Sequence, residues 1–148
     1  MKVTVDINVL LDVFQKREPH YAASARILTM VQQGEMIGVF PAHGFMTLYY
    51  LVCKHASRPD AEAAMDHVLR HFEVGNLSSA GWARARSLRM PDFEDAVVAV
   101  VAVVAVVAVE SASEFIVTRN TGDFTDSPVL GITPTDFLSR YKPFSTPG

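Results

Sequence analysis

Residues 2–14 read KVTVDINVLLDVF, and they combine two patterns that set the start of the architecture. Val3 and Val5 alternate with polar residues, which predicts a short buried strand ending at Asp6. Residues 7–14 place apolar side chains at the spacing of an α-helix, so a helix should follow this strand directly. A strand that leads straight into a helix is typical of folds in which strands and helices alternate.

Predicted helices and strands alternate along the rest of the chain, with Pro19, Gly34 and Pro41 marking ends between them. Further helices are expected at 21–31, from 43, at 60–72, at 79–88 after an N-cap at Ser78, from the segment 91–95 and from 134. Further strands are expected at 36–40, 74–77, 115–118 and 129–132. This alternation predicts an α/β fold with a mainly parallel sheet covered on both faces by helices. Because no linker interrupts the pattern, residues 1–148 are expected to form a single domain.

The composition is that of a globular protein, with 49% hydrophobic and 20% charged residues among 148. The formal net charge of −3 does not by itself favour a nucleic-acid-binding protein, since such domains are often basic. Cys53 is the only cysteine, so no internal disulfide can form, and a reducing, cytoplasmic location is expected. The first residues lack the pattern of a signal peptide, which favours the same location.

Residues 96–109 form a nearly perfect Ala-Val-Val repeat. The run is too short for a bilayer, which needs about 20 apolar residues, so no membrane segment is expected. Valine is a weak helix former, but an entirely apolar helix is stable when it is buried on every side. Two explanations stay open: a helix packed centrally and at a subunit interface, or a sequence in which not every residue is native.

Three aspartates stand where one predicted element gives way to the next. Asp6 follows the first strand, Asp95 lies in the first turn of the apolar helix, and Asp123 follows the strand at 115–118. The carboxyl ends of parallel strands share one edge of a sheet, so these side chains should meet there. Crowded carboxylates repel one another unless a cation intervenes, and oxygen ligands favour Mg²⁺ or Mn²⁺ over Zn²⁺. A metal ion held there can activate water and stabilise charge on a phosphodiester.

Each acid also has a purely structural interpretation. Asp6 could cap the helix that follows it, because aspartate is a favoured N-cap. Asp92 and Asp95 could be first-turn acids that complement a helix dipole. Asp123 could be an ordinary turn residue within Thr121-Gly122-Asp123.

Three segments together resemble the PIN-domain ribonucleases, the class that includes the VapC-type toxins of toxin–antitoxin pairs. They are VDINVLLD at 5–12, DFEDA at 92–96, and IVTRN at 116–120 with Asp123 and Phe124 after it. All three occur in the family's order and spacing, and the resemblance covers essentially the whole chain. It implies a three-layer α/β/α sandwich and phosphodiester cleavage that depends on Mg²⁺ or Mn²⁺. It also implies homodimers and a cognate antitoxin protein as partners.

The same resemblance implies roles for individual residues. Asp6, Asp95 and Asp123 would be catalytic metal ligands, with Asp123 the anion of the last motif. Asn8 would orient the first turn by hydrogen bonding, Asn120 would be the hydrogen-bonding neighbour of Asp123, and Asp92 would be a secondary acid one turn before Asp95.

The sequence departs from the family pattern in the helix that begins near His43. Many PIN domains carry a glutamate near the metal in this helix, and Thr47 occupies that position here. Fewer anions imply weaker metal binding. His43 could contact phosphate or support the metal ligands, although a capping or packing role is at least as plausible.

Four basic residues are candidates for contacts with RNA phosphates: Lys54, Arg84, Arg86 and Arg119. The main alternative function is a catalytically weak PIN-fold module that binds RNA or a protein. A receiver-like phosphoacceptor domain is disfavoured, because the late strand ends in Thr118-Arg119-Asn120 and lacks the lysine that such a domain needs. No feature of the sequence separates RNA from DNA as the substrate.

Overall fold

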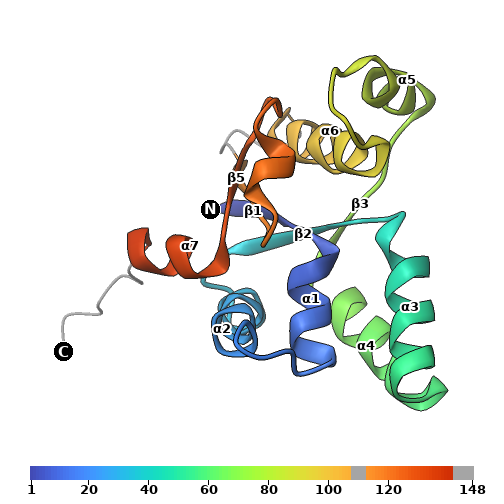
Figure 1. Ribbon diagram of the computed structural model, residues 1–148, viewed down its shortest axis with the longest axis vertical. Coiled ribbons are helices and arrows are strands. Elements are labelled where there is room, and N and C mark those ends of the chain that lie inside the picture. Colours follow the sequence, from blue (N-terminus) through green and yellow to red (C-terminus); the bar gives the residue numbers. More distant parts are fainter. Residues whose placement is uncertain (108–112, 142–148) are drawn as a thin grey trace.

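The chain is described here by a computed structural model that covers residues 1–107 and 113–141. Its centre is a sheet of five parallel strands in the order β3-β2-β1-β4-β5 (Figure 1). The strands are β1 (Lys2–Val5), β2 (Ile37–Pro41), β3 (Glu73–Gly75), β4 (Ser113–Val117) and β5 (Leu130–Ile132). The predicted parallel sheet is therefore confirmed.

Helices cover both faces of this sheet (Figure 1). One face carries α1 (Ile7–Phe14), α2 (Tyr21–Gln32), α3 (Gly44–His55), α4 (Arg58–His71) and α7 (Pro134–Arg140). The other face carries α5 (Ser79–Ser87), α6 (Phe93–Val107) and the short 3-10 helix η1 (Thr121–Phe124). Alternation along the strands divides the core, since Val3 and Val5 of β1 pack with the first group of helices. The predicted α/β/α sandwich is confirmed.

Hydroxyl side chains begin three of the helices. Ser57, Ser78 and Thr133 each accept a hydrogen bond from a backbone N–H of the first turn, in α4, α5 and α7 respectively. The N-cap predicted at Ser78 is thus confirmed. The predicted strand at 74–77 begins and ends earlier in the chain, at Glu73–Gly75. It ends at Gly75 because this residue pairs with Pro41, the last residue of β2. The helix η1 was not predicted.

The Ala-Val-Val run forms most of α6, and every side chain from Ala96 to Ala102 is at most 2% exposed. One side of the helix packs against Val39 of β2 and Ala85 of α5, and the other against Ile116 of β4 and Phe124 of η1. The sheet and its neighbours therefore bury this part of the run within one chain, so it needs no subunit interface. Residues 108 and 109 lie outside the described residues. None of the described helices is long and apolar enough to cross a membrane.

The register of β1 and β4 brings two distant segments together at the carboxyl edge of the sheet. Val5 lies opposite Val117, and the N–H of Asp6 donates to the carbonyl oxygen of Val117 at 3.0 Å. Asp6 and Thr118, the first residues beyond the two strands, are therefore neighbours.

Candidate acidic active site

Asp6 occupies the turn between β1 and α1, where its carboxylate is held on both oxygens. Its Oδ1 accepts from the N–H of Ile7 at 2.8 Å, and its Oδ2 accepts from the Thr118 hydroxyl at 2.9 Å. The side chain is the N-cap of α1, as the structural interpretation predicts. Helix capping is not the only interaction of this carboxylate, because it also lies close enough to Glu94 and Asp123 at the sheet edge to be repelled by them.

Asn8 and Thr118 connect the two segments on either side of Asp6. The Asn8 amide Nδ2 lies 3.3 Å from both Asp6 Oδ2 and Thr118 Oγ1, while Asn8 Oδ1 accepts from the N–H of Arg119 at 3.2 Å. Thr118 is fully buried and also accepts from the N–H of Asn120 at 3.1 Å. Thr118 was missed as a site residue. No local pattern in the sequence marks this hydroxyl, because its burial and its bond to Asp6 arise only when β1 and β4 pair.

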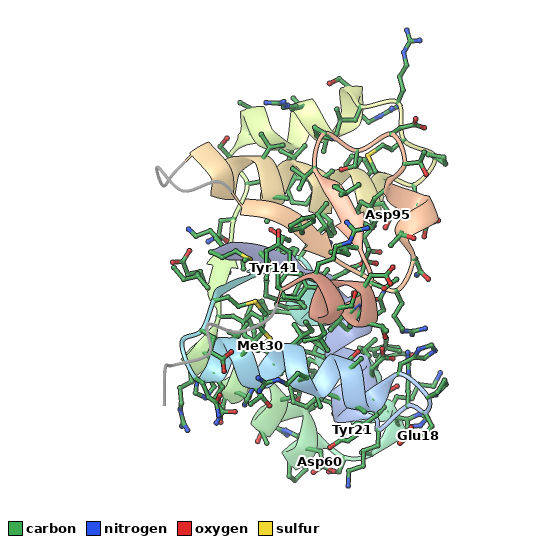
Figure 2. All side chains as sticks on the ribbon, turned by 90° about the vertical axis from the view of Figure 1, so that its left-hand side faces the viewer. Glu18, Tyr21, Met30, Asp60, Asp95 and Tyr141 are labelled. Atoms are coloured by element: carbon green, nitrogen blue, oxygen red, sulfur yellow. The ribbon has the colours of Figure 1, made fainter. Side chains whose placement is uncertain are left out.

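Asp92 and Asp95 lie at the start of α6, and they behave differently. Asp92 Oδ1 accepts from the N–H of Asp95 at 3.1 Å, so Asp92 has the helix-capping role. Asp95 lies three residues further, in the first turn of α6. It is far from Asp60, an exposed acid in the first turn of α4 (Figure 2). Burial raises the pKa of Asp95 to about 7, and repulsion from Asp92, Asp6, Asp123 and Glu94 adds to the rise.

The aspartates of the three motifs therefore influence one another. Burial also raises the pKa of Asp6, with Glu94 and Asp123 adding to the rise and the hydrogen bond from Thr118 opposing it. Asp123 is exposed on η1, and its N–H donates to the carbonyl oxygen of Asn120 at 3.0 Å. Asn120 thus shapes the turn that carries Asp123 through its backbone.

The carboxylates are near enough to repel one another, yet they are not gathered into a finished ligand set. Within residues 1–107 and 113–141, no three His, Cys, Asp or Glu side chains are placed to hold a metal ion together. The electrostatic coupling and this spacing are compatible, because repulsion acts over longer distances than coordination bonds of about 2.0–2.6 Å. Closing the set would require side-chain rotation or bridging water.

His43 and Thr47 lie at the start of α3, the helix in which the sequence departs from the family pattern. His43 precedes α3, and its Nε2 lies 3.8 Å from Glu94 Oε1. Burial lowers the pKa of His43, while Glu94 opposes this effect. Because His43 is half-buried beside an acid of the cluster, it borders the site. Thr47 is exposed one turn into α3.

The four basic candidates are placed very differently. Arg119 Nε lies 2.7 Å from Oδ2 of the fully buried Asp12, so its charge is already paired, although the N–H is not directed at that oxygen. Lys54 stands at the last turn of α3, about 16 Å along the helix from the His43 end. Arg84 and Arg86 are exposed on the last turn of α5, and Arg86 contacts a pocket beside the start of α6.

Comparison with known proteins agrees with this architecture. The family model of the PIN domain matches residues 2–122. Among solved structures, VapBC2 from Rickettsia felis bound to a DNA fragment from their promoter is similar with a TM-score of 0.65 and 18% identity, over 90% of this chain and 98% of that chain. FitAcB from Neisseria gonorrhoeae is similar with a TM-score of 0.60 and 15% identity, over 90% and 98% of the two chains. The search of curated proteins gave no significant match.

Proposed function

This chain belongs to the PIN-domain family, and we propose from that membership and from its acidic cluster that it is a metal-dependent ribonuclease. The observation that carries the proposal is the Asp6 carboxylate, which Thr118 and Asn8 hold at the carboxyl edge of the sheet near enough to Asp95 and Asp123 for the three to repel one another. Negative charge concentrated at one sheet edge attracts a divalent cation and repels an RNA phosphate in its absence. The reaction proposed is hydrolysis of an RNA phosphodiester bond.

The residues present suit a hard divalent ion, Mg²⁺ or Mn²⁺. The donors are carboxylate oxygens, and the described residues offer no Cys–His set that would favour zinc. Mg²⁺ keeps several of its waters and needs only one or two carboxylates, so Asp6, Asp95 and Asp123 could hold it partly through bridging water. These three aspartates are the proposed ligands. When bound, the ion would supply charge stabilisation and an activated water.

The neighbouring side chains hold and orient this cluster. Thr118 and Asn8 both donate to Asp6 Oδ2 and so hold this carboxylate at the end of β1. Asp92 holds the first turn of α6 and so fixes the backbone that presents Asp95. Rigid positioning of this kind lowers the cost of assembling a reactive geometry.

Two kinds of protein partner belong to the same proposal. The resemblance to VapC-type toxins and the structural likeness to VapBC2 support a cognate antitoxin protein. Homodimers and a cytoplasmic location are proposed on the same resemblance.

One observation favours a second candidate, a PIN-fold module that binds RNA or protein and cuts feebly. Thr47 replaces the family's glutamate on α3. Among the described residues, no three acidic side chains lie close enough together to hold one metal ion. Weak metal binding would follow from both features. RNA binding without metal-dependent cleavage would identify this second candidate.

The test is cleavage of end-labelled single-stranded and structured RNA by the full chain, with Mn²⁺, with Mg²⁺ or with EDTA. The proposal expects cleavage with metal only, and DNA of the same sequence measures the preference for RNA. Asp123→Asn should reduce the rate by about 100-fold or more, since even residues outside the ligand shell of metal sites cost 10–100-fold. Asp136→Asn, an equally exposed first-turn acid on α7, is the matched control and should cut normally. Equal rates with metal and with EDTA would reject the proposal.

A further inference from the structure

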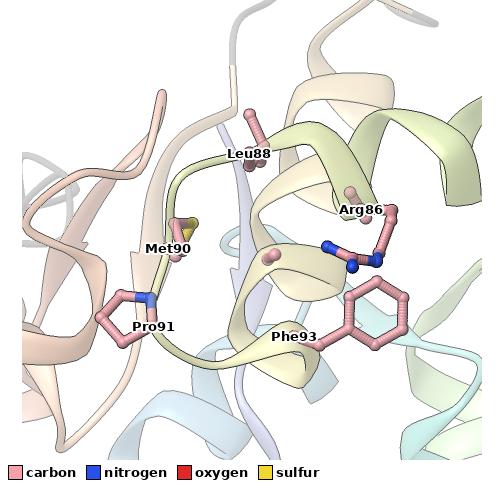
Figure 3. Close-up of a pocket in the computed structure, with 7 residues that line it drawn as sticks. Arg86, Leu88, Met90, Pro91 and Phe93 are labelled. Carbon is pink, nitrogen blue, oxygen red and sulfur yellow. The ribbon is translucent and has the colours of Figure 1, made fainter.

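A pocket of about 320 Å³ lies between the end of α5 and the start of α6 (Figure 3). Its walls are mostly apolar, and they come from α5, from the connecting loop and from the first turn of α6: Ala85, Arg86, Leu88, Met90, Pro91 and Phe93. This size is at the lower end of the range for small-molecule sites, which runs from about 300 to 1,000 Å³.

Phe93, which lines the pocket, forms an exposed pair with the neighbouring ring of Trp82, which is not part of the pocket wall. Phe93 is 49% exposed and Trp82 is 42% exposed, and their ring centroids are 6.3 Å apart with planes inclined by 39°. Aromatic side chains of this size usually bury most of their surface, so an exposed pair beside a pocket marks a binding surface. Because every nucleobase has a π face, such rings offer a stacking platform for unpaired bases.

Arg86 brings a positive charge to the wall of the same pocket. The Arg86 side chain extends toward the Phe93 ring (Figure 3), and Arg84 and Arg89 lie on either side of it in the sequence. None of these three guanidinium groups has an ion-pair partner within residues 1–107 and 113–141. An apolar peptide would leave these charges unpaired, whereas the phosphates that flank a nucleobase would neutralise them. Guanidinium planes also stack on bases.

The pocket adjoins the acidic cluster across a single helical turn. Phe93 and Ala96, three residues apart, both line the pocket, while Asp92 and Asp95, each one residue earlier, lie about 100° away around the same turn. Phe93 lies directly between Asp92 and Glu94 in the chain. A strand of RNA that places a phosphate at the carboxylates can therefore extend a neighbouring base around this turn into the pocket.

We propose that the pocket between α5 and α6 binds an unpaired nucleobase next to the scissile phosphate, stacked on Phe93 and Trp82 with Arg86 beside it. This inference rests on the proposed ribonuclease function and adds to it a preference for single-stranded RNA. The subsite acts by positioning the substrate strand.

Trp82 is the only tryptophan of the chain, so its fluorescence reports directly on this site. The experiment titrates a short single-stranded oligoribonucleotide into the full chain in EDTA, which prevents metal-dependent cleavage. Saturable quenching is expected with single-stranded RNA and not with a duplex of the same length. A set of oligonucleotides with one abasic position each should lose the quenching at a defined position.

Phe93→Leu keeps an apolar side chain at an exposed position and removes the ring. It should weaken RNA binding by about 5- to 150-fold, the loss expected when one base–aromatic stack is removed. In the cleavage assay with Mn²⁺ it should raise KM more than it lowers kcat. Phe93→Tyr should behave as wild type. Leu69→Ala is the matched control, since Leu69 is 59% exposed on α4, on the other face of the sheet from the pocket, and it should leave RNA binding unchanged.

Four outcomes decide the inference. Position-specific loss of quenching together with weaker binding by Phe93→Leu supports it. Wild-type cleavage with unchanged KM in Phe93→Leu overturns it and leaves the ribonuclease function standing. A Phe93→Leu protein that changes only its oligomeric state, with RNA binding intact, overturns it in favour of a contact between copies of this chain. If the wild-type chain neither binds nor cuts RNA, the proposed function and the subsite both fail.

Discussion

Asp95→Asn should make the metal-free protein more stable, and by an amount that depends on pH. The folded state raises the pKa of Asp95 from 3.8 to about 7, so the ionised carboxylate opposes folding. Wild-type stability should fall relative to Asp95→Asn as pH rises from about 4 to 7. Above pH 7 the difference should stay constant, because Asp95 is then ionised in both states.

The size of this effect follows from the pKa change. A shift of about 3 units corresponds to ~4 kcal/mol at 1.36 kcal/mol per unit, which is an upper limit. Asp95 is partly exposed, and screening by solvent reduces the expected gain to about 1–2 kcal/mol. For a domain of this size, such a gain raises Tm by about 2–8 °C. Added Mn²⁺ should reverse the order, since it stabilises only a protein that binds it well.

Thermal unfolding at pH 4.5, 6 and 8, with and without Mn²⁺, measures the effect. Asp60→Asn is the matched control, because Asp60 is an exposed first-turn acid of α4 outside the cluster. It should leave Tm unchanged or lower it slightly at every pH. If Asp95→Asn melts below wild type at pH 8, or if its advantage is the same at pH 4.5 and 8, the carboxylate repulsion argued here is absent.

Further substitutions test the supports of the site. Thr118→Val should lower the free energy of unfolding in urea by about 1–3 kcal/mol, because the buried Asp6 Oδ2 loses a hydrogen-bond donor. Thr4→Val is the control and should leave that free energy unchanged. The Thr4 hydroxyl is equally buried, but it has no hydrogen-bond partner among the described residues. Equal losses in the two variants would show that the bond to Asp6 contributes nothing. Arg119→Met should lower the free energy of unfolding by about 3–5 kcal/mol, because it leaves the buried charge of Asp12 without its partner. Adding Asp12→Leu to this variant should restore most of the lost stability. An Arg119→Met chain as stable as wild type would contradict the ion pair.

Much of the fold was predictable because its signals are local. The alternation of Val3 and Val5, the helical spacing of residues 7–14 and the cap at Ser78 each predict an element that the structure contains. Parallel strands then require Asp6 and the segment after β4 to meet at one edge, which needs only the topology. The burial of residues 96–102 needed the full structure, because two different clusters of the core enclose α6.

The remaining features depend on contacts between residues far apart in sequence. Thr118 supports Asp6 across 112 positions, and no local pattern marks that hydroxyl. The charge of Arg119 made it a candidate for a contact with RNA phosphate. In the structure it pairs instead with Asp12, which is buried in α1. The pocket at Phe93 arises only when α5 packs beside the start of α6.

The most direct measurement of the central claim is the position of Mn²⁺ in crystals of the full chain, located by its anomalous scattering. The account predicts a peak at the carboxyl edge of the sheet, within coordination distance of Asp6 and Asp95 and linked to Asp123 directly or through water. The peak should disappear in Asp95→Asn and remain in Asp60→Asn. A protein that cleaves RNA with Mn²⁺ but holds the ion elsewhere, or that keeps the same peak without Asp95, would contradict the assignment of this site.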